Sequence, residues 1–238
     1  MRLPGPVDPE AAGVLRVSGG AATFHVAPGR GFTVDGRAVE TSARLVSDAE
    51  GEPTRVRRGS VEFHIIARGG RLAARVRDTE HEERRRFPGI ASFPLDPAWR
   101  IEARFEPYDP PRRRAVAGVQ GMLEETFPGA VVFETAGGPH RLEVIRERGE
   151  TDFWIVFGDA TNGRETYGAG RFVYAPPPDD GRTVVDFNKA YNPPCAFTPF
   201  STCPLPPAGN RLRIRVEAGE KFDNRSSAGL TPGRPAAP

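Results

Sequence analysis

Short alternations of apolar and polar residues recur along the chain and predict β-strands. In "SVEFHIIA" (60–67) and "RLAARVRD" (71–78), apolar side chains fall on every second position over most of each stretch, which is the period of a strand with one inward face. The sequence "ARGGRL" (67–72) joins these two stretches and predicts a tight hairpin turn. Further strands are expected at 20–27, 99–108, 113–120, 130–136, 140–147, 151–159, 170–175, 182–187 and 210–218.

Helical periodicity is nearly absent, and the best candidates are single turns near 48–50 and in "DPAWR" (96–100). Without crossover helices the strands are expected to pair antiparallel. The pattern therefore predicts an all-β fold, an antiparallel β-sandwich or distorted barrel with a long proline-rich loop and very little helix. We expect one domain over 1–222, with divergent N-terminal strands in 1–55 and a core in 56–222. The segment 223–238 lacks a hydrophobic pattern and is predicted to be disordered.

Charge and composition narrow the range of partners. The 33 basic residues are nearly matched by 31 acidic ones, so we expect no nucleic-acid partner. The arginine runs at 84–86 and 112–114 lie near acidic residues and are expected to form solvated faces. No stretch is apolar over the length of a signal peptide or a membrane span, so the sequence predicts a cytoplasmic protein without a membrane partner. A homo-oligomer is compatible with the sequence.

The segment 192–210 contains six prolines and is the best candidate for one wall of a small-molecule site. Long irregular loops in compact domains are often functional, and proline stiffens them. Just before it, Asp186 and Asn188 are expected on one face of a strand. Asp186 is a candidate general base, and Asn188 and Asn192 are candidates to bind a carbonyl. The alternative is that Asp186 and Asn188 cap loop amides. Tyr191 and Phe197 are further candidates for substrate binding.

A second wall is expected from the turn-rich segment 159–172. Arg171 is either an electrostatic clamp on the substrate or part of a structural pair with Asp186. Tyr167 is a candidate substrate-binding residue from the same segment, in which Asp159, Arg164 and Glu165 also lie.

Four residues in the first half of the chain complete the set of candidates. His64 lies within an alternating strand, and "VRDTEH" (76–81) places Arg77, Asp78 and His81 at the end of another. Histidine is the usual acid or base near neutral pH, so His64, His81 and Asp78 are candidate catalytic residues and Arg77 is a candidate for substrate binding. A structural role for each histidine is the alternative.

No metal or cofactor is expected. Cys195 and Cys203 lack the closely spaced partners of a zinc site and are expected to be buried, inert thiols. The chain has no G-x-S-x-G elbow and no phosphate-binding loop, and "HEERR" (81–85) has Arg85 where a zinc protease has its second histidine.

Three stretches carry a resemblance to a known bacterial family. They are 76–108, 157–178 and 184–221, and the last includes "FNKAYNPPCAFTPFSTCPLPPAGN". The chain resembles the family called domain of unknown function 1684, whose name implies no activity. Members usually begin with a Trp- and Leu-rich segment and a pattern similar to phosphopeptide-binding forkhead-associated domains. The first 50 residues here depart from that pattern, which implies a specialised member.

The sequence thus predicts a cofactor-independent enzyme that acts on a small, largely apolar metabolite, with a natural-product intermediate as one setting. The chemistry would be acid- and base-assisted elimination, addition, cyclisation or isomerisation. The alternatives are a binding module for a carbohydrate or another small molecule, and a hydrolase of unrecognised type.

Overall fold

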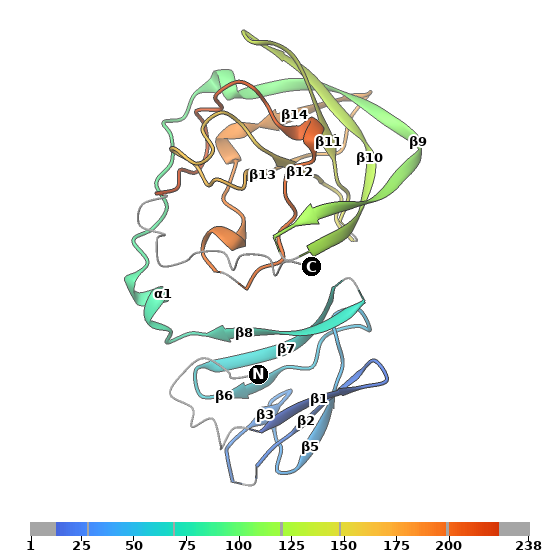
Figure 1. Ribbon diagram of the computed structural model, residues 1–238, viewed down its shortest axis with the longest axis vertical. Helices are drawn as coiled ribbons and strands as arrows, with labels where there is room; N and C mark the ends of the chain where they lie inside the picture. Colours follow the sequence, from blue (N-terminus) through green and yellow to red (C-terminus); the bar gives the residue numbers. More distant parts are fainter. Residues whose placement is uncertain are drawn as a thin grey trace. The chain divides into compact units, whose positions relative to one another are not determined.

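The computed structural model describes residues 13–27, 29–68, 70–119, 121–147, 149–198 and 200–223. Antiparallel strands are the main secondary structure of the described residues, with one short α-helix and a few 3-10 turns (Figure 1). The all-β prediction is confirmed. The tail predicted to be disordered, 223–238, lies outside the described residues except for Asp223.

The chain divides into two compact units, residues 1–88 and 89–238. The sequence analysis instead expected a single domain with an internal boundary after residue 55. The structural division falls after Pro88 because the strands between residues 56 and 78 continue the sheet that begins at Thr33.

The first unit contains two small sheets. Their strand orders are β1-β2-β5 and β4-β3-β6-β7-β8. Inward side chains of both sheets, such as Phe24 and Phe63, pack in one cluster. The predicted hairpin at 67–72 is confirmed, since Arg68 pairs with Arg71. The strands are β1 (Val14–Ser18), β2 (Ala21–His25), β3 (Thr33–Val34), β4 (Arg37–Ala38), β5 (Ser42–Leu45), β6 (Val56–Arg58), β7 (Val61–Arg68) and β8 (Arg71–Asp78).

Helix α1 (Glu82–Arg86) was not predicted from the sequence. Its five residues are all charged and exposed. The segment therefore has no apolar periodicity from which a helix could be predicted. The His81 ring caps its first turn, and Glu82 pairs with Arg86 at 2.5 Å. The arginine run at 84–86 is therefore a solvated face, as expected.

The second unit is a half-barrel. A four-stranded sheet has the order β11-β10-β9-β14, and β12 pairs with β13. Backbone hydrogen bonds between Ile145 and Trp154 (2.7 and 2.8 Å) connect the end of β11 to β12. The strands are β9 (Arg100–Gly118), β10 (Gly121–Thr135), β11 (Gly138–Val144), β12 (Phe153–Phe157), β13 (Arg171–Ala175) and β14 (Arg182–Asp186), and the 3-10 turns are η1 (Pro97–Trp99), η2 (Phe187–Lys189), η3 (Pro194–Ala196) and η4 (Ala208–Asn210).

Strand β9 merges two strands that the sequence predicted separately. The prolines between them suggested a break, but the chain continues through a cis peptide at Asp109–Pro110. The pairing of β9 with β10 shifts register between Phe127 and Gly129. A bulge of this kind bends and twists a hairpin, and the long β9–β10 hairpin curves visibly in Figure 1.

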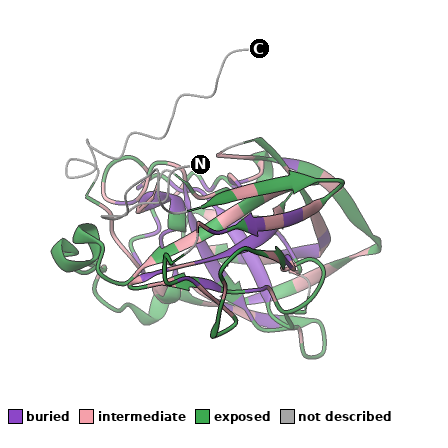
Figure 2. Ribbon diagram, turned by 90° about the horizontal axis from the view of Figure 1, so that it is seen from below, coloured by how far each residue is buried: buried purple, intermediate pink, exposed green. Residues whose placement is uncertain are grey.

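Two hydrophobic clusters lie on opposite faces of the β12–β13 ladder. All five residues of β12 and four of the five residues of β13 are buried, and buried residues are purple in Figure 2. The first cluster includes Phe153, Ile155 and Phe157. The second cluster consists of Val116, Phe127, Ile145, Trp154, Val156, Phe172, Cys195 and Cys203, with Tyr108, Val119, Leu123, Tyr167 and Tyr191 packed against it.

Two predicted strands require correction. Strand β14 ends at Asp186, because the Asp186 carboxylate accepts the Asn188 N–H at 3.2 Å and begins a 3-10 turn. The segment 210–218 is not a strand. Its alternating residues Leu212 and Val216 are buried as predicted, but Leu212 N–H bonds to Gly158 and Val216 N–H bonds to the Asp159 side chain rather than to a ladder.

Candidate functional site

A pair of carboxyl groups lies on the face of the half-barrel that carries the second cluster. Glu125 of β10 alternates with Leu123 and Phe127, both of which pack in that cluster, so its side chain is on the same apolar face. The Arg146 N–H bonds to the Thr126 carbonyl at 3.1 Å. This bond places Glu147 beside Glu125 across the strands. We call Glu125 and Glu147 the carboxyl pair.

The environment of Glu125 favours its neutral form. Burial raises the pKa of Glu125 to about 7, and the negative charge of Glu147 adds to the rise. Desolvation and a like charge both penalise an ionised carboxylate. A perturbed acid with a specific charged neighbour is a recognised sign of a functional site.

Aromatic residues from β12, from β13 and from the position just before the proline-rich loop form a wall beside the carboxyl pair. The Tyr174 hydroxyl donates to Glu147 Oε2 at 2.8 Å. The Tyr174 ring stacks with Tyr191 at 6.0 Å, and Phe172 meets Tyr191 edge-on at 5.7 Å. Trp154 packs edge-on against Phe172 at 4.7 Å. We call Trp154, Phe172, Tyr174 and Tyr191 the aromatic wall.

The tyrosine hydroxyls of the aromatic wall stay protonated. Burial raises the pKa of Tyr174, and neighbouring Tyr191 and Glu147 add to it, so its hydroxyl stays protonated. Burial also raises the pKa of Tyr191, which the Tyr174 hydroxyl and the Trp154 indole partly oppose. Although it lies near Tyr191, the buried Trp154 Nε1 makes no hydrogen bond of regular geometry with the described residues.

The proline-rich loop packs against the same cluster through its two cysteines. The Cys195 N–H donates to Cys203 Sγ at 3.3 Å, and the Tyr167 hydroxyl donates to the Cys195 carbonyl at 3.1 Å. Both cysteines are buried, free thiols. The Cys195 side chain lowers the pKa of Cys203, while the Cys203 side chain and burial raise the pKa of Cys195.

The match with a family model identifies the chain. Residues 85–221, more than half of the 238, match the family described as "Protein of unknown function (DUF1684)". The chain belongs to the DUF1684 family. No curated protein matches it.

A solved structure has a similar fold. It is the solution NMR structure of an uncharacterized protein from Haloarcula marismortui, which shares 30% sequence identity with a TM-score of 0.52. The similarity covers 60% of this chain and 81% of that one. The DUF1684 resemblance drawn from the sequence is thus confirmed, and the site is described from its own residues.

Arg171 is buried in a structural ion pair instead of lying at a ligand site. Its side chain is 0% exposed and pairs with Asp159 at 2.9 Å, so the pairing with Asp186 considered from the sequence does not form. The guanidinium also donates to the carbonyls of Val216, Ala218 and Glu220. These bonds hold the segment 216–220 against β13, which leaves Arg171 no access to a substrate.

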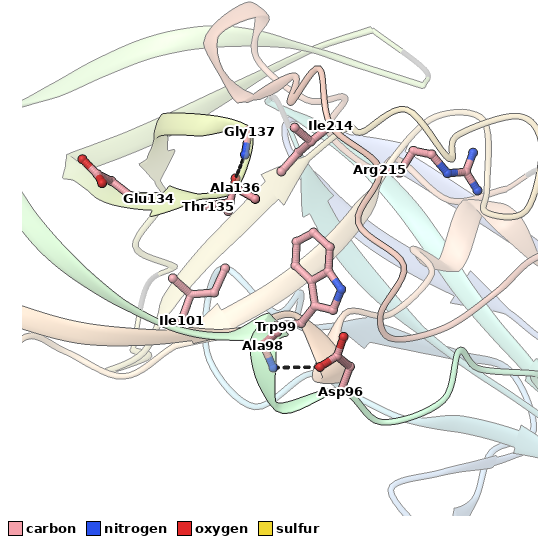
Figure 3. A pocket seen from close by; sticks show the side chains of 10 residues that line it. All are labelled: Asp96, Ala98, Trp99, Ile101, Glu134, Thr135, Ala136, Gly137, Ile214 and Arg215. Carbon is pink, nitrogen blue, oxygen red and sulfur yellow. Dashed lines mark hydrogen bonds between the residues drawn. The ribbon is translucent and has the colours of Figure 1, made fainter.

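Asp186 and Asn188 belong to a hydrogen-bonded turn. Asn188 Nδ2 donates to Asp186 Oδ1 at 3.1 Å and to the Asp96 carbonyl at 2.9 Å, and Asn188 Oδ1 accepts the Asp96 N–H at 3.0 Å. Lys189 lies 3.9 Å from Asp186. This geometry matches the capping alternative. Asp96 in turn lines a pocket of about 430 Å³ (Figure 3).

The other predicted residues of the second unit lie in or near the loop and in the segment 159–172. Asn192 is buried, and its amide donates to the Lys221 carbonyl at 2.9 Å while its backbone N–H donates to Glu220 at 2.7 Å. Phe197 packs edge-on against Phe222 at 5.9 Å. Tyr167 and Tyr191 are the two predicted binding residues that contact the second cluster.

The four candidates from the first half of the chain all lie in the other unit. His64 of β7 is buried, and burial together with nearby arginines lowers its pKa. His81 caps α1 by accepting the Glu83 N–H at 3.3 Å. Asp78 accepts the Glu80 N–H at 3.0 Å, and a hydrogen bond from Ser60 lowers its pKa. Arg77 is exposed.

Neither a metal-binding cluster nor a membrane-spanning helix is found among the described residues. They contain no group of three or more His, Cys, Asp and Glu side chains arranged to hold a metal ion. None of their helices has the length and apolar character needed to cross a membrane.

Sequence reasoning missed Glu125, Glu147, Trp154 and Tyr174. A signal for Glu125 exists in "MLEETF" (122–127), where it occupies the inward position between Leu123 and Phe127. The predicted strand began at residue 130, so this position was not recognised as inward. The proximity of Glu147 depends on strand register, which no local pattern encodes.

Proposed function

We propose that this DUF1684 protein is a cofactor-independent acid–base enzyme that acts on a small, largely apolar substrate at the carboxyl pair. The observation that carries the proposal is the placement of Glu125 on an apolar face beside Glu147, which is held by the Tyr174 hydroxyl at 2.8 Å. The pKa of Glu125, raised to about 7, supports it, because a group that titrates near neutral pH both accepts and donates protons efficiently.

The two carboxyl groups suit different roles. Glu147, whose negative charge raises the pKa of Glu125, is the candidate base, oriented by Tyr174. Glu125 in its neutral form is the candidate acid. Two carboxyl groups whose environments separate their protonation states are a common arrangement for acid–base chemistry. The aromatic wall would hold the apolar body of the substrate.

With these two roles, the carboxyl pair would catalyse a redox-neutral isomerisation without a cofactor. Glu147 would remove a proton from a carbon next to a carbonyl group, and the electron pair would move to form an enol-type double bond. Glu125 would return a proton at the other end of the conjugated system. One proton is removed and one is returned, so the atoms balance. An elimination or addition uses the same two transfers with one leaving or entering group.

A non-catalytic binding module is the second candidate, because stacked rings such as Tyr174 and Tyr191 are typical of surfaces that bind apolar or sugar-like ligands. In that case Glu125 would affect affinity alone. A cytoplasmic setting is part of the proposal, since free thiols at Cys195 and Cys203 fit a reducing compartment.

The test is a metabolite panel followed by thermal shift and mass spectrometry. Wild type is compared with Glu125→Gln and with Glu124→Gln, an exposed neighbour on the opposite face of β10. We expect a compound that stabilises all three proteins and is converted by wild type and Glu124→Gln, with conversion reduced about 100-fold or more in Glu125→Gln. Binding without conversion by any of them would support the binding module. Equal conversion by Glu125→Gln would refute the role of the carboxyl pair.

A further inference from the structure

The pocket that Asp96 lines has the features of a second small-molecule site, which we call the Trp99 pocket. Its volume of about 430 Å³ lies within the range of ligand sites. It is built by the start of β9, the turn between β10 and β11, and the segment after η4. The lining residues are Asp96, Ala98, Trp99, Ile101, Glu134, Thr135, Ala136, Gly137, Ile214 and Arg215.

The apolar part of the Trp99 pocket is fixed in place by packing. Figure 3 shows the Trp99 ring between Ile101 and Ile214. Behind it, the ring meets Phe187 edge-on at 6.0 Å, and Phe187 is completely buried in the first cluster. A ring held this way presents a rigid surface at little cost in conformational entropy.

The polar edge of the pocket is also fixed. Asp96 Oδ1 accepts the Ala98 N–H at 2.9 Å, which begins the turn that carries Trp99. The two Asn188 hydrogen bonds hold the Asp96 backbone. The Asp186–Asn188 pair that the sequence singled out therefore supports a wall of this pocket.

A glycine shapes the opposite wall. A Cβ atom at Gly137 would lie 2.6 Å from Ile214 Cγ2, well inside van der Waals contact. The turn therefore approaches Ile214 as closely as the backbone permits. A larger residue at position 137 would displace Ile214 and change the pocket.

The charges around the pocket favour a cation. Asp96 carries a negative charge, and Figure 3 shows its carboxylate beside Trp99, whereas the Glu134 carboxylate points away from the ring. Arg215 points away from Trp99 in the same view and is paired with Glu165 at 2.6 Å and Glu217 at 2.8 Å. The positive charge of Arg215 is thus balanced outside the pocket. A carboxylate next to an indole ring is suited to an ammonium group.

We propose that the Trp99 pocket binds a small molecule with an apolar body and a protonated amine. The amine would lie at Asp96 and the indole of Trp99, and the apolar body against Ile101 and Ile214. This site uses no residue of the carboxyl pair or the aromatic wall, so it stands independently of the proposed function.

The experiment uses the two tryptophans of the chain as separate reporters. In full-length Trp154→Phe, Trp99 is the sole indole, and in Trp99→Phe it is Trp154. Each protein is titrated with phenethylamine, 2-phenylethanol and 3-phenylpropanoate while indole fluorescence is followed. We expect phenethylamine to change Trp99 emission saturably and to bind more tightly than the alcohol, with the acid weakest and no response from Trp154.

Variants in the Trp154→Phe background test the geometry. Asp96→Asn keeps an oxygen to cap the turn and should weaken phenethylamine binding about 10-fold to 100-fold. Gly137→Val should also weaken it by displacing Ile214. Glu102→Gln, which removes an exposed charge elsewhere on β9, should leave binding unchanged and serves as the control.

Three results would overturn the proposal. One is the absence of a saturable Trp99 response to phenethylamine. The second is binding that does not depend on charge, seen either as equal affinity for the amine and the alcohol or as unchanged affinity in Asp96→Asn. The third is tight binding in Gly137→Val with circular dichroism like that of the parent protein, which would place the ligand elsewhere.

Discussion

The Tyr174 hydroxyl donates a 2.8 Å hydrogen bond to Glu147, and Glu147 lies beside Glu125 on the apolar face of the half-barrel. Through this contact a residue of β13 orients one carboxyl group, while burial raises the pKa of the other to about 7. The two carboxyl groups of the pair therefore lie close together in different environments.

Removing the Glu125 carboxyl should change how stability depends on pH. The folded-state pKa of Glu125 is raised to about 7 from an ordinary 4.5, so the neutral group stabilises the fold below the ordinary pKa, and this contribution is lost as pH rises through about 7. The difference in free energy of unfolding between Glu125→Gln and wild type is the quantity compared. We expect it to favour the variant by about 1–3 kcal/mol more at pH 8 than at pH 4. Urea unfolding at both pH values measures this, with Glu124→Gln as control. A pH-independent difference would contradict the account.

The buried pair of Arg171 and Asp159 should be essential for stability. Arg171→Met removes four hydrogen bonds and leaves the Asp159 carboxylate without its cation. We expect a loss of about 3–5 kcal/mol in the free energy of unfolding, or failure to fold. Arg182→Met removes an exposed pair at 4.0 Å and should have almost no effect. Similar unfolding midpoints for the two variants would show that the pair is not important.

Gly170 should tolerate no side chain. Its φ is +102°, and a Cβ atom would lie 2.6 Å from both the Phe157 carbonyl oxygen and Pro206 Cγ. Gly138 has a similar φ of +100° with nothing within 4 Å, so it isolates the cost of backbone strain. We expect Gly138→Ala to lose about 1–2 kcal/mol and Gly170→Ala about 1–3 kcal/mol more. Thermal unfolding of the two variants measures the difference, and equal losses would argue against the close contact.

The two cysteines should react at different rates. The pKa of Cys203 is lowered and that of Cys195 is raised by their shared hydrogen bond, and the thiolate is the reactive form. We expect iodoacetamide to alkylate Cys203 first in the native protein, as measured by peptide mass spectrometry. In urea the two rates should become equal. Preferential alkylation of Cys195 in the native protein would contradict the assignment.

The fold class was predicted correctly because most strands show a local alternation of apolar and polar residues. Alternation in "SVEFHIIA" and "RLAARVRD" depends only on local side chains, and the hairpin between Arg68 and Arg71 follows from its glycines. Helix α1 escaped prediction because none of its five residues is buried. The long strand β9 was predicted as two strands because its prolines suggested a break. Pairing with β10 keeps the strand continuous across them.

The candidate site was less predictable because it depends on contacts between distant segments. Asp186 and Asn188 stood out as polar residues in an apolar context, but their partner Asp96 lies 92 positions from Asn188. Arg171 was a candidate because it is charged. Its burial depends on Asp159 and the segment 216–220, and no local pattern predicts these contacts. Tyr191 was found because it lies next to the conspicuous loop, whereas the position of Glu147 depends on strand register.

The most direct test of the central claim is a carbon-detected NMR titration of the Glu125 carboxyl group in the full-length protein, from about pH 4 to about pH 9. Glu125→Gln provides the assignment. We predict a midpoint near 7, which falls in Glu147→Gln but stays above the ordinary 4.5, because burial is the larger cause and the like charge the smaller one. A wild-type midpoint near 4.5 would show that Glu125 is an ordinary solvated carboxylate and would contradict an acid–base role for the pair.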